Sequence, residues 1–344
     1  MNSPFTQRQD DGCVVIAEIA QAHDGSLGMA HAYIDAVAEA GADAVKFQTH
    51  IAAAESTRRE PWRAKFSRQD DSRYDYWQRM EFSEAQWAGL KAHAAERDLL
   101  FISSPFSEAA VELLERIGVD AWKIASGEVG SGPLLDAMAS SGLPTVLSTG
   151  MSDWAEIDAA VERLLALELP TSVLQCTSMY PTPPEKVGLG VLAELRARYG
   201  LPVGLSDHSG TIHAGLAAVA LGASIVEVHV AFSRHVFSPD LPVSLTIPEL
   251  RQLCDGARAI PPMLPATDKD ALADELRSMR GLFTKSLVAA RPLEAGQRLT
   301  RGDIALKKPG DGLGAEHLDA LIGRVLSRPL EADERFTDAD LADL

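Results

Sequence analysis

The chain has 344 residues, 46% of them hydrophobic, and is long enough for one large domain or for a large and a small one. Acidic side chains outnumber basic ones by 49 to 32, giving a formal net charge of −17, which argues against nucleic acid or an anionic membrane surface as a partner. Any anionic ligand must therefore be held by a local cluster of donors.

Cysteine usage and apolar patterning indicate a cytoplasmic protein. Cys13, Cys176 and Cys254 are few and odd in number, which is typical of reduced thiols. The N-terminal segment MNSPFTQRQDDG lacks the basic-then-apolar layout of a signal peptide. The longest apolar stretch, residues 214–232, contains Glu227 and His229 and is broken by glycines, so it predicts a helix and then a strand rather than a membrane span.

Short runs rich in valine, isoleucine and aromatic residues alternate with segments of helical periodicity, such as the one that Ser107 can cap and Gly118 can terminate. The apolar runs predict eight strands, at residues 13–20, 43–50, 99–106, 121–127, 145–151, 172–180, 203–209 and 224–232. Such apolar strands favour a parallel sheet covered on both faces, and eight units in about 250 residues match a (β/α)8 TIM barrel. An open doubly wound sheet is the alternative, but Gly25 and Gly28 miss the spacing of its usual phosphate loop.

The connection after the second predicted strand is long, charged and aromatic, and spans residues 51–83. It is expected either to cover a ligand at the catalytic face or to form a surface excursion.

The chain divides into a predicted barrel over residues 1–262, a linker rich in proline and acidic residues over 263–282, and a small β-rich module over 283–344. Within that module, the segments PLEAGQRLTRGDI (292–304) and PLEADERFTDADL (329–341) resemble one another. The module is therefore expected to be internally repetitive.

In a TIM barrel, side chains at the carboxyl ends of the strands converge on one mouth. Here those ends are far too polar for a packed interior: they carry Glu18, Lys46, Gln48, Ser103, Ser104, Lys123, Ser126, Glu128, Ser148, Thr149, Thr177, Ser178, Tyr180, Ser206, Asp207, His208, Glu227 and His229.

Two lysines at strand ends need anionic partners, because burying an unpaired ammonium group is costly. Lys46 and Lys123 could pair with carboxylates such as Glu18 or Glu128. Alternatively, two cations ringed by small donors suit a phosphate group. The hydroxyls available for this are those of Ser126, Ser148, Ser178 and Ser206.

Two histidines, His208 and His229, end the seventh and eighth predicted strands and could share one divalent ion. Two imidazoles with open positions suit a catalytic metal site, although each could equally be a hydrogen-bonded barrel residue. Asp207 could ligate the metal, orient an imidazole or cap the next helix.

At these residues the chain resembles the sialic acid synthase family, enzymes that condense phosphoenolpyruvate with a sugar aldehyde to make nine-carbon 2-keto acids. The likeness is carried, in order, by VIAEIAQAHDGSLGMAHAYIDAVAEAGADAVKFQT, ISSPFSEAAVELLERIGVDAWKIASGE, PTVLSTGMS, CTSMYPTPPEKV, LPVGLSDHSG, LGASIVEVHV and SPDLPVSLTIPEL. The segment KSLVAARPLEAGQRLTRGDIALKKPGDGLG resembles the antifreeze-like (SAF) domain of the same enzymes.

The resemblance implies a TIM barrel followed by a SAF domain that is swapped onto the partner's barrel in a homodimer. It implies that His208 and His229 hold a divalent metal, Mn²⁺ or Mg²⁺. The positions that surround phosphoenolpyruvate would be Lys46, Lys123, Ser126, Ser148, Ser178 and Ser206, and those near the sugar or the metal would be Glu18, Gln48, Glu128, Tyr180 and Asp240. Glu18 and Glu128 would move protons or bind sugar hydroxyls.

Several residues depart from the family pattern around the sugar. Ala22 and Asp24 stand where asparagines are common, Val228 replaces a lysine and Leu241 replaces a histidine. Lys308 replaces an arginine that contacts the N-acetyl group, and lysine lacks the planar donor fork of arginine. The acceptor is thus expected to differ from N-acetylmannosamine, with deacetylated, diacetamido or shortened sugars open.

The implied reaction joins phosphoenolpyruvate to an aldose, with metal assistance and C–O cleavage, to give a 2-keto-3-deoxy acid and phosphate. Two alternatives are a metal-dependent aldolase acting on pyruvate or a phosphorylated ketone, and a catalytically silent sugar-binding scaffold. Release of phosphate from phosphoenolpyruvate separates the first of these from the synthase.

Overall fold

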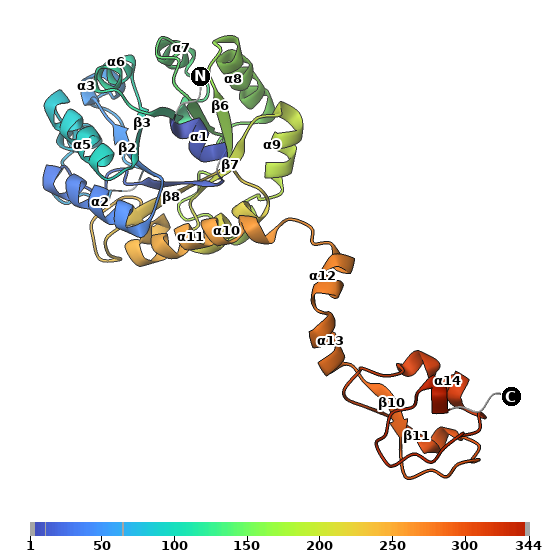
Figure 1. The fold of residues 1–344 in the computed structure, drawn as a ribbon. Coiled ribbons are helices and arrows are strands. Elements are labelled where there is room, and N and C mark those ends of the chain that lie inside the picture. The colour runs from blue at the N-terminus through green and yellow to red at the C-terminus, as the bar shows by residue number, and fades with distance from the viewer. Residues whose placement is uncertain (1–3, 11, 64, 341–344) are drawn as a thin grey trace. The chain divides into compact units, whose positions relative to one another are not determined.

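A computed structural model describes residues 4–10, 12–63 and 65–340 of the chain (Figure 1). The chain forms two compact units, Met1–Pro265 and Ala266–Leu344.

The first unit is a closed parallel barrel, as predicted. Its strands follow chain order, each pairing with the next, and β8 returns to β1. Their bounds are β1 Val14–Glu18, β2 Ala44–Thr49, β3 Leu100–Pro105, β4 Ala121–Ile124, β5 Thr145–Ser148, β6 Thr171–Cys176, β7 Val203–Asp207 and β8 Ile225–Ala231, and a short β9 (Leu245–Thr246) extends the edge of β8. The register sets Glu18 beside both Lys46 and His229, so the predicted polar strand ends do meet.

Helices surround the barrel and cover the outer faces of its strands (Figure 1). The predicted limits of one of them are confirmed: the Ser107 hydroxyl accepts from the backbone N–H of Ala110, and Gly118 adopts the left-handed conformation that ends the helix. The bounds are α2 Leu27–Ala40, α3 Ala52–Glu55, α4 Arg73–Met80, α5 Glu84–Glu96, α6 Glu108–Ile117, α7 Gly132–Ala139, α8 Trp154–Ala166, α9 Val191–Tyr199, α10 Ile212–Ala220 and α11 Ile247–Ala259. No helix in the described part of the chain is long and apolar enough to cross a membrane.

A helix that the sequence patterns did not reveal, α1 (Pro4–Asp10), lies at the amino end of the barrel. Its Phe5 is completely buried in a cluster with the inward-facing apolar residues of the strands, among them Ile16 and Ile102. Because the residues around Phe5 are polar, this segment shows no apolar periodicity from which a buried helix could be predicted. The helix plugs the end of the barrel opposite the strand carboxyl ends, which leaves the other end for a ligand.

The second unit begins with two short helices, α12 (Lys269–Glu275) and α13 (Arg277–Phe283), within the predicted linker. An antiparallel pair, β10 (Ser286–Ala289) and β11 (Ile304–Lys307), and a short helix, α14 (Leu318–Leu321), follow. The two similar segments occupy equivalent places. In each, a threonine hydroxyl donates to an aspartate three residues later, Thr300 to Asp303 and Thr337 to Asp340. Leu293 and Leu330, which occupy equivalent positions in the two segments, exchange two backbone hydrogen bonds.

Candidate active site

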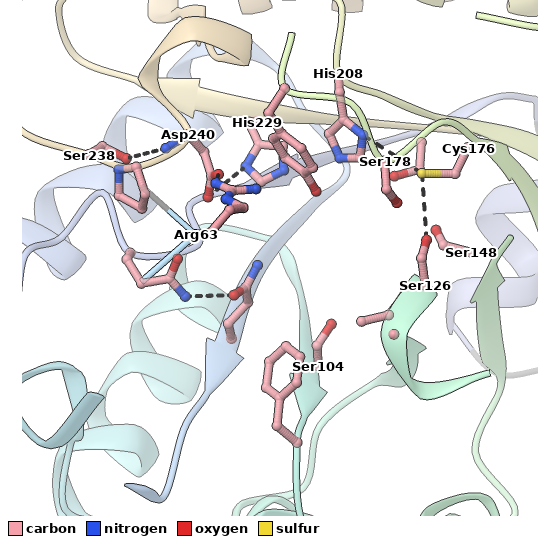
Figure 2. Close-up of a pocket in the computed structure, with 18 of the residues that line it drawn as sticks. Arg63, Ser104, Ser126, Ser148, Cys176, Ser178, His208, His229, Ser238 and Asp240 are labelled. Atoms are coloured by element: carbon pink, nitrogen blue, oxygen red, sulfur yellow. Dashed lines mark hydrogen bonds and ion pairs between the residues drawn. The ribbon is translucent and has the colours of Figure 1, made fainter. Parts of the chain in front are cut away.

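A pocket of about 660 Å³ opens at the carboxyl ends of the strands (Figure 2). It brings together most of the predicted site residues: Lys46, Gln48, Lys123, Ser126, Ser148, Ser178, Tyr180, Ser206, His208, His229 and Asp240. Glu18, Glu128 and Lys308 are not among the residues that line it.

The floor of the pocket is a buried network of two lysines and two carboxylates. Lys46 forms an ion pair with Glu18, and its Nζ lies 3.6 Å from Glu227 Oε1. Lys123 Nζ lies 3.5 Å from the same Glu227 oxygen, to which the Ser206 hydroxyl also donates at 3.1 Å. The partner of Lys123 is therefore Glu227 rather than Glu128. A spacing of two residues on β8 puts Glu227 on the same barrel face as His229, and this was the signal available in the sequence.

The electrostatics of this floor are set by burial and by mutual attraction. Burial by itself would raise the pKa of Glu227, but Lys123 and Lys46 overcome this effect and lower it to about 2. Burial lowers the pKa of Lys46 to about 7, although Glu227 partly counters the effect. The charge of Lys46 is therefore sensitive to pH near neutrality.

Hydroxyl groups and one glycine form the wall beside Lys123. Its Nζ donates to the Ser148 hydroxyl at 2.7 Å, and the Ser126 hydroxyl accepts the backbone N–H of Gly150 at 3.0 Å. A Cβ atom at Gly150 would lie 2.8 Å from Cys176 Sγ and 2.9 Å from Ser126 Oγ. Gly150 is therefore required by the convergence of side chains around it, and sequence reasoning missed it.

Ser104, at the end of β3, is a further candidate ligand contact. Its side chain is 1% exposed and lines the pocket, yet its hydroxyl has no hydrogen-bond partner among the described residues. Buried hydroxyls are nearly always satisfied, so an orphan that faces a cavity points to a bound polar group.

The rings of His208 and His229 lie next to each other on one side of the pocket (Figure 2), with centroids 5.3 Å apart and planes tilted by 43°. The backbone carbonyl of Thr177 lies 3.0 Å from His208 Nδ1, which favours a proton on that nitrogen and leaves Nε2 available as a ligand. Burial and repulsion from His208 and Lys46 hold the pKa of His229 well below its usual value, so that its imidazole is neutral.

This donor set fits a divalent cation that is held by two imidazoles and keeps open positions for oxygen ligands. The described residues contain no group of three or more histidine, cysteine or acidic side chains placed to hold a metal. Burial disfavours the charged form of His208, but the contact with Cys176 outweighs burial and raises the pKa of His208. A bound cation would displace the extra proton of the charged His208 imidazole.

Asp207 stabilises the turn before α10 and does not cap that helix, whose N-cap position is Thr211. Its carboxylate accepts from the backbone N–H of Ser209 at 2.9 Å and from the Ser209 hydroxyl at 2.8 Å. It thereby fixes the turn that follows His208.

The long connection after β2 contributes a further part of the pocket wall, and its residues 56–63 and 65–83 are called the lid here. Its aromatic side chains pack together, with Trp62 and Phe66 against the buried residues Tyr76 and Trp77. The pocket lining includes Trp62, Arg63, Phe66, Arg73, Tyr76 and Trp77 from this segment. Of the two expectations for this connection, the structure supports the one that places it at the catalytic face, because it lines the pocket there.

Arg79 fastens the lid to the loop after β1. Its guanidinium pairs with Asp70 at 2.8 Å and with Asp24 at 2.8 Å. Asp24, which stands where asparagine is common in the family, therefore pairs with a residue of the lid. Asp24 also adopts a positive φ of 49°, and the contact with Arg79 helps hold this strained turn.

Arg63 was not identified from the sequence, yet it reaches the side of the pocket that carries His229. Its Nη2 donates to Asp240 Oδ1 at 3.0 Å, and its guanidinium carbon lies 4.4 Å from the centroid of the Tyr180 ring. Asp240 Oδ2 in turn lies 3.9 Å from Nδ1 of His229. No local motif marks this arginine, because only the fold of the lid brings it to the mouth.

Two predicted residues lie apart from this cluster. Glu128 is half-buried in a 3-10 turn, Ser126–Glu128, where burial and repulsion from Glu55 raise its pKa. Lys308 belongs to the second unit, is exposed, and places its ammonium 5.2 Å from the centroid of the Phe283 ring.

A TIM barrel with buried lysines, clustered hydroxyls and paired histidines at its mouth defines an enzyme-type pocket for an anionic ligand. The chain belongs to the NeuB family, whose model matches residues 33–269, and it carries a SAF domain at 284–342. It is 33% identical to the N,N'-diacetyllegionaminic acid synthase of Campylobacter jejuni over 91% of this chain and 95% of the relative. It is 32% identical to the N-acetylneuraminate-9-phosphate synthase of Homo sapiens over 86% and 83%.

A solved structure agrees with these relatives. The N-acetylneuraminic acid synthetase of Leptospira borgpetersenii superposes with a TM-score of 0.68 at 30% identity, covering 78% of this chain and 91% of that one. The resemblance seen in the sequence is thereby confirmed at the level of the family and the fold.

Proposed function

We propose that the protein joins phosphoenolpyruvate to the aldehyde carbon of an open-chain aldose, giving a 2-keto-3-deoxy acid of the sialic type and inorganic phosphate. The observation that carries this proposal is the floor of the pocket. Lys46 and Lys123, both 3% exposed, sit beside clustered hydroxyls and the orphan Ser104, next to the histidine pair. In an acidic chain, such a pocket is suited to an anion. The relatives named as synthases support the same assignment.

The reaction forms one carbon–carbon bond and one carbon–oxygen bond, the latter from water to C2, and it breaks one carbon–oxygen bond; one proton of the water ends on the former aldehyde oxygen and the other on the phosphate. C3 of phosphoenolpyruvate attacks the aldehyde carbon, water adds at C2, and the bond from C2 to the bridging oxygen breaks as phosphate leaves. A divalent cation such as Mn²⁺ or Mg²⁺, held by His208 and His229, would supply Lewis acidity toward the aldehyde oxygen.

The residues of the chain hold the phosphate and orient the two substrates. Lys46 and Lys123 attract the phosphate and carboxylate, while Ser126, Ser148, Ser178 and Ser206 donate hydrogen bonds to them. Gln48 and Tyr180 line the pocket on the side of the sugar, together with Asp240. Glu18 is completely buried and acts on the pocket through Lys46 and Gln48, to which it is joined by an ion pair and a 3.1 Å hydrogen bond. Glu128, whose pKa is raised by burial, lies in the turn that begins at Ser126 but does not line the pocket, so we assign it no proton transfer.

We also propose a homodimer in which the second unit completes the site of the other copy. Residues 263–283 expose several large apolar side chains, with Met263 73% and Phe283 65% exposed, and Leu264, Leu276, Met279 and Leu282 also exposed. Exposed apolar side chains grouped in this way indicate a surface that another protein surface covers. A second copy would cover it and bring Lys308 to the acceptor. Light scattering should give twice the mass of the chain; a monomer that is fully active would refute the dimer.

The test of the reaction follows the bridging oxygen. Phosphoenolpyruvate labelled with ¹⁸O between C2 and phosphorus is incubated with an aldose and Mn²⁺, and both products are analysed by mass spectrometry. C–O cleavage predicts that all of the label leaves with phosphate. Label retained in the organic acid, or phosphate release that does not require an aldose, would rule out the proposed reaction. An aldolase acting on pyruvate would form no phosphate at all.

A further inference from the structure

Gln21 is a pocket residue that neither the sequence patterns nor the proposed chemistry accounts for. It lies in the loop after β1, lines the pocket and is only 4% exposed. Because the eight strands of the closed barrel follow chain order, β1 and β2 lie across the barrel from β5 and β6. Ser148, in the wall that we assign to phosphate, ends β5. Gln21 therefore lies on the opposite side of the pocket, where we place the sugar.

A buried histidine fixes the amide group of Gln21. Nδ1 of His50 lies 2.6 Å from the carboxylate of Glu55, which favours a proton on that nitrogen and leaves Nε2 as a hydrogen-bond acceptor. Gln21 Nε2 lies 2.9 Å from His50 Nε2 and also donates to Gln48 Oε1 at 2.6 Å. Both N–H groups of the Gln21 amide are therefore used within the protein.

The imidazole of His50 is itself held between two aromatic rings. Trp77 of the lid stacks on one side, with centroids 3.9 Å apart and planes at 18°, and Phe106, which follows β3, stacks with centroids 4.6 Å apart and planes at 6°. The side chain of His50 is only 4% exposed and that of Glu55 8%. The stacking fixes the plane of the imidazole, and with it the direction in which the Gln21 amide points.

The carbonyl oxygen of Gln21 is the part of the amide that is left for a ligand. Among the residues that the structure describes, none donates a hydrogen bond to Gln21 Oε1. An amide oxygen has two lone pairs and no proton, so it accepts hydrogen bonds and donates none. A ligand group that meets this oxygen must therefore bring a proton, as a sugar hydroxyl does.

We infer that Gln21 is a specificity-determining residue that accepts a hydrogen bond from one hydroxyl group of the sugar, and that His50 is the residue that positions it. The inference rests on the proposed condensation and adds a requirement on the aldose. A site built to pair a hydroxyl discriminates against the analogue that lacks it, because the buried amide oxygen is then left without a partner.

The test measures phosphate release from phosphoenolpyruvate with Mn²⁺ and a parent aldose, and then with derivatives of that aldose in which one hydroxyl at a time is replaced by hydrogen or by fluorine. The parent is whichever of N-acetylmannosamine, mannose and a 2,4-diacetamido aldose has the highest kcat/KM. Each sugar is measured with the wild type, Gln21→Met, His50→Phe and His50→Gln. Gln252→Met is the matched control, because Gln252 is exposed on α11 and does not line the pocket.

In the wild type, replacement of one particular hydroxyl should lower kcat/KM by about tenfold, whereas the same replacement should cost Gln21→Met less than about twofold. KM for phosphoenolpyruvate should not change. His50→Phe keeps the stacking but not the hydrogen bonds, so it should lose most of the discrimination. His50→Gln can still donate to Glu55 and accept from Gln21, so it should keep the discrimination. Gln252→Met should behave as the wild type.

Three results would overturn the inference while leaving the condensation intact. The first is a wild type for which no single hydroxyl matters. The second is a Gln21→Met variant whose losses are equal for the parent and all derivatives, which would show that the amide only supports Gln48. The third is unchanged discrimination in His50→Phe. Thermal unfolding checks each variant, and if Gln21→Met does not fold, the comparison of His50→Phe with His50→Gln decides. Absence of phosphate release by the wild type with every parent aldose would instead refute the proposed function itself.

Discussion

Replacing Gly150 by alanine tests the geometry of the phosphate site with a single methyl group. The new Cβ would lie 2.8 Å from Cys176 Sγ and 2.9 Å from Ser126 Oγ, and closer still to the Ser178 hydroxyl. These atoms are side-chain ends, so they can yield, but they must move by about 0.5 to 1 Å to restore ordinary contact. Overpacking of this kind costs about 1–3 kcal/mol of stability, and the fold should survive.

The kinetic effect of Gly150→Ala should be larger than the effect on stability. Displacing catalytic contacts by about 1 Å can cost a factor of about 100 in rate. We therefore expect kcat/KM for phosphoenolpyruvate to fall by about 10- to 100-fold, and KM for the aldose to change little. Initial-rate assays and thermal unfolding measure both. Gly89→Ala is the control, because no atom lies within 4 Å of its added Cβ. Wild-type kinetics in Gly150→Ala would refute the placement of phosphate beside Ser126 and Ser178.

Three further predictions concern charge, the lid and the plug. Burial lowers the pKa of Lys46 to about 7, so its ammonium group loses its charge as the pH rises, and kcat/KM for phosphoenolpyruvate should fall above about pH 7. In Lys46→Arg, this fall in kcat/KM should occur at a higher pH. A fall at the same pH in the variant would contradict the assignment. Arg79→Ala removes the contacts with Asp70 and Asp24, so amide exchange should accelerate in residues 62–80 but not in the strands; uniform protection would show that the lid does not need this contact. Phe5→Ala should lower the free energy of unfolding by about 3–5 kcal/mol with little change in kcat at 25 °C, and a loss below about 1 kcal/mol would show that the plug is dispensable.

The barrel could be predicted because its information is local. Runs such as residues 145–151 are short, apolar and rich in branched residues, and they recur with helices between them. Once the strands close in order, topology alone brings His208, His229, Lys46 and Lys123 to one mouth. The (β/α)8 prediction and the grouping of these residues therefore required no long-range information beyond the fold class.

The remainder depended on contacts that no local pattern encodes. Arg63 is one of many charged residues between 51 and 83, and only the packing of the lid selects it. Gly150 is constrained by Cys176 and Ser178, which follow it by a whole helix and strand. Glu227 was visible as a polar strand residue, but its bond to Lys123 depends on register and rotamer. Phe5 lies among polar neighbours in a helix of only 7 residues, which is too short to show a clear apolar periodicity.

The most direct test of the central claim measures phosphate release from phosphoenolpyruvate with Mn²⁺ and a panel of aldoses, in the wild type and in His208→Ala. We predict phosphate release that requires both an aldose and the metal, and its loss by at least about 100-fold in His208→Ala. Thermal unfolding of His208→Ala should confirm that the fold is retained. Phosphate release that is unaffected by the substitution, or absent with every aldose, would contradict the proposed chemistry.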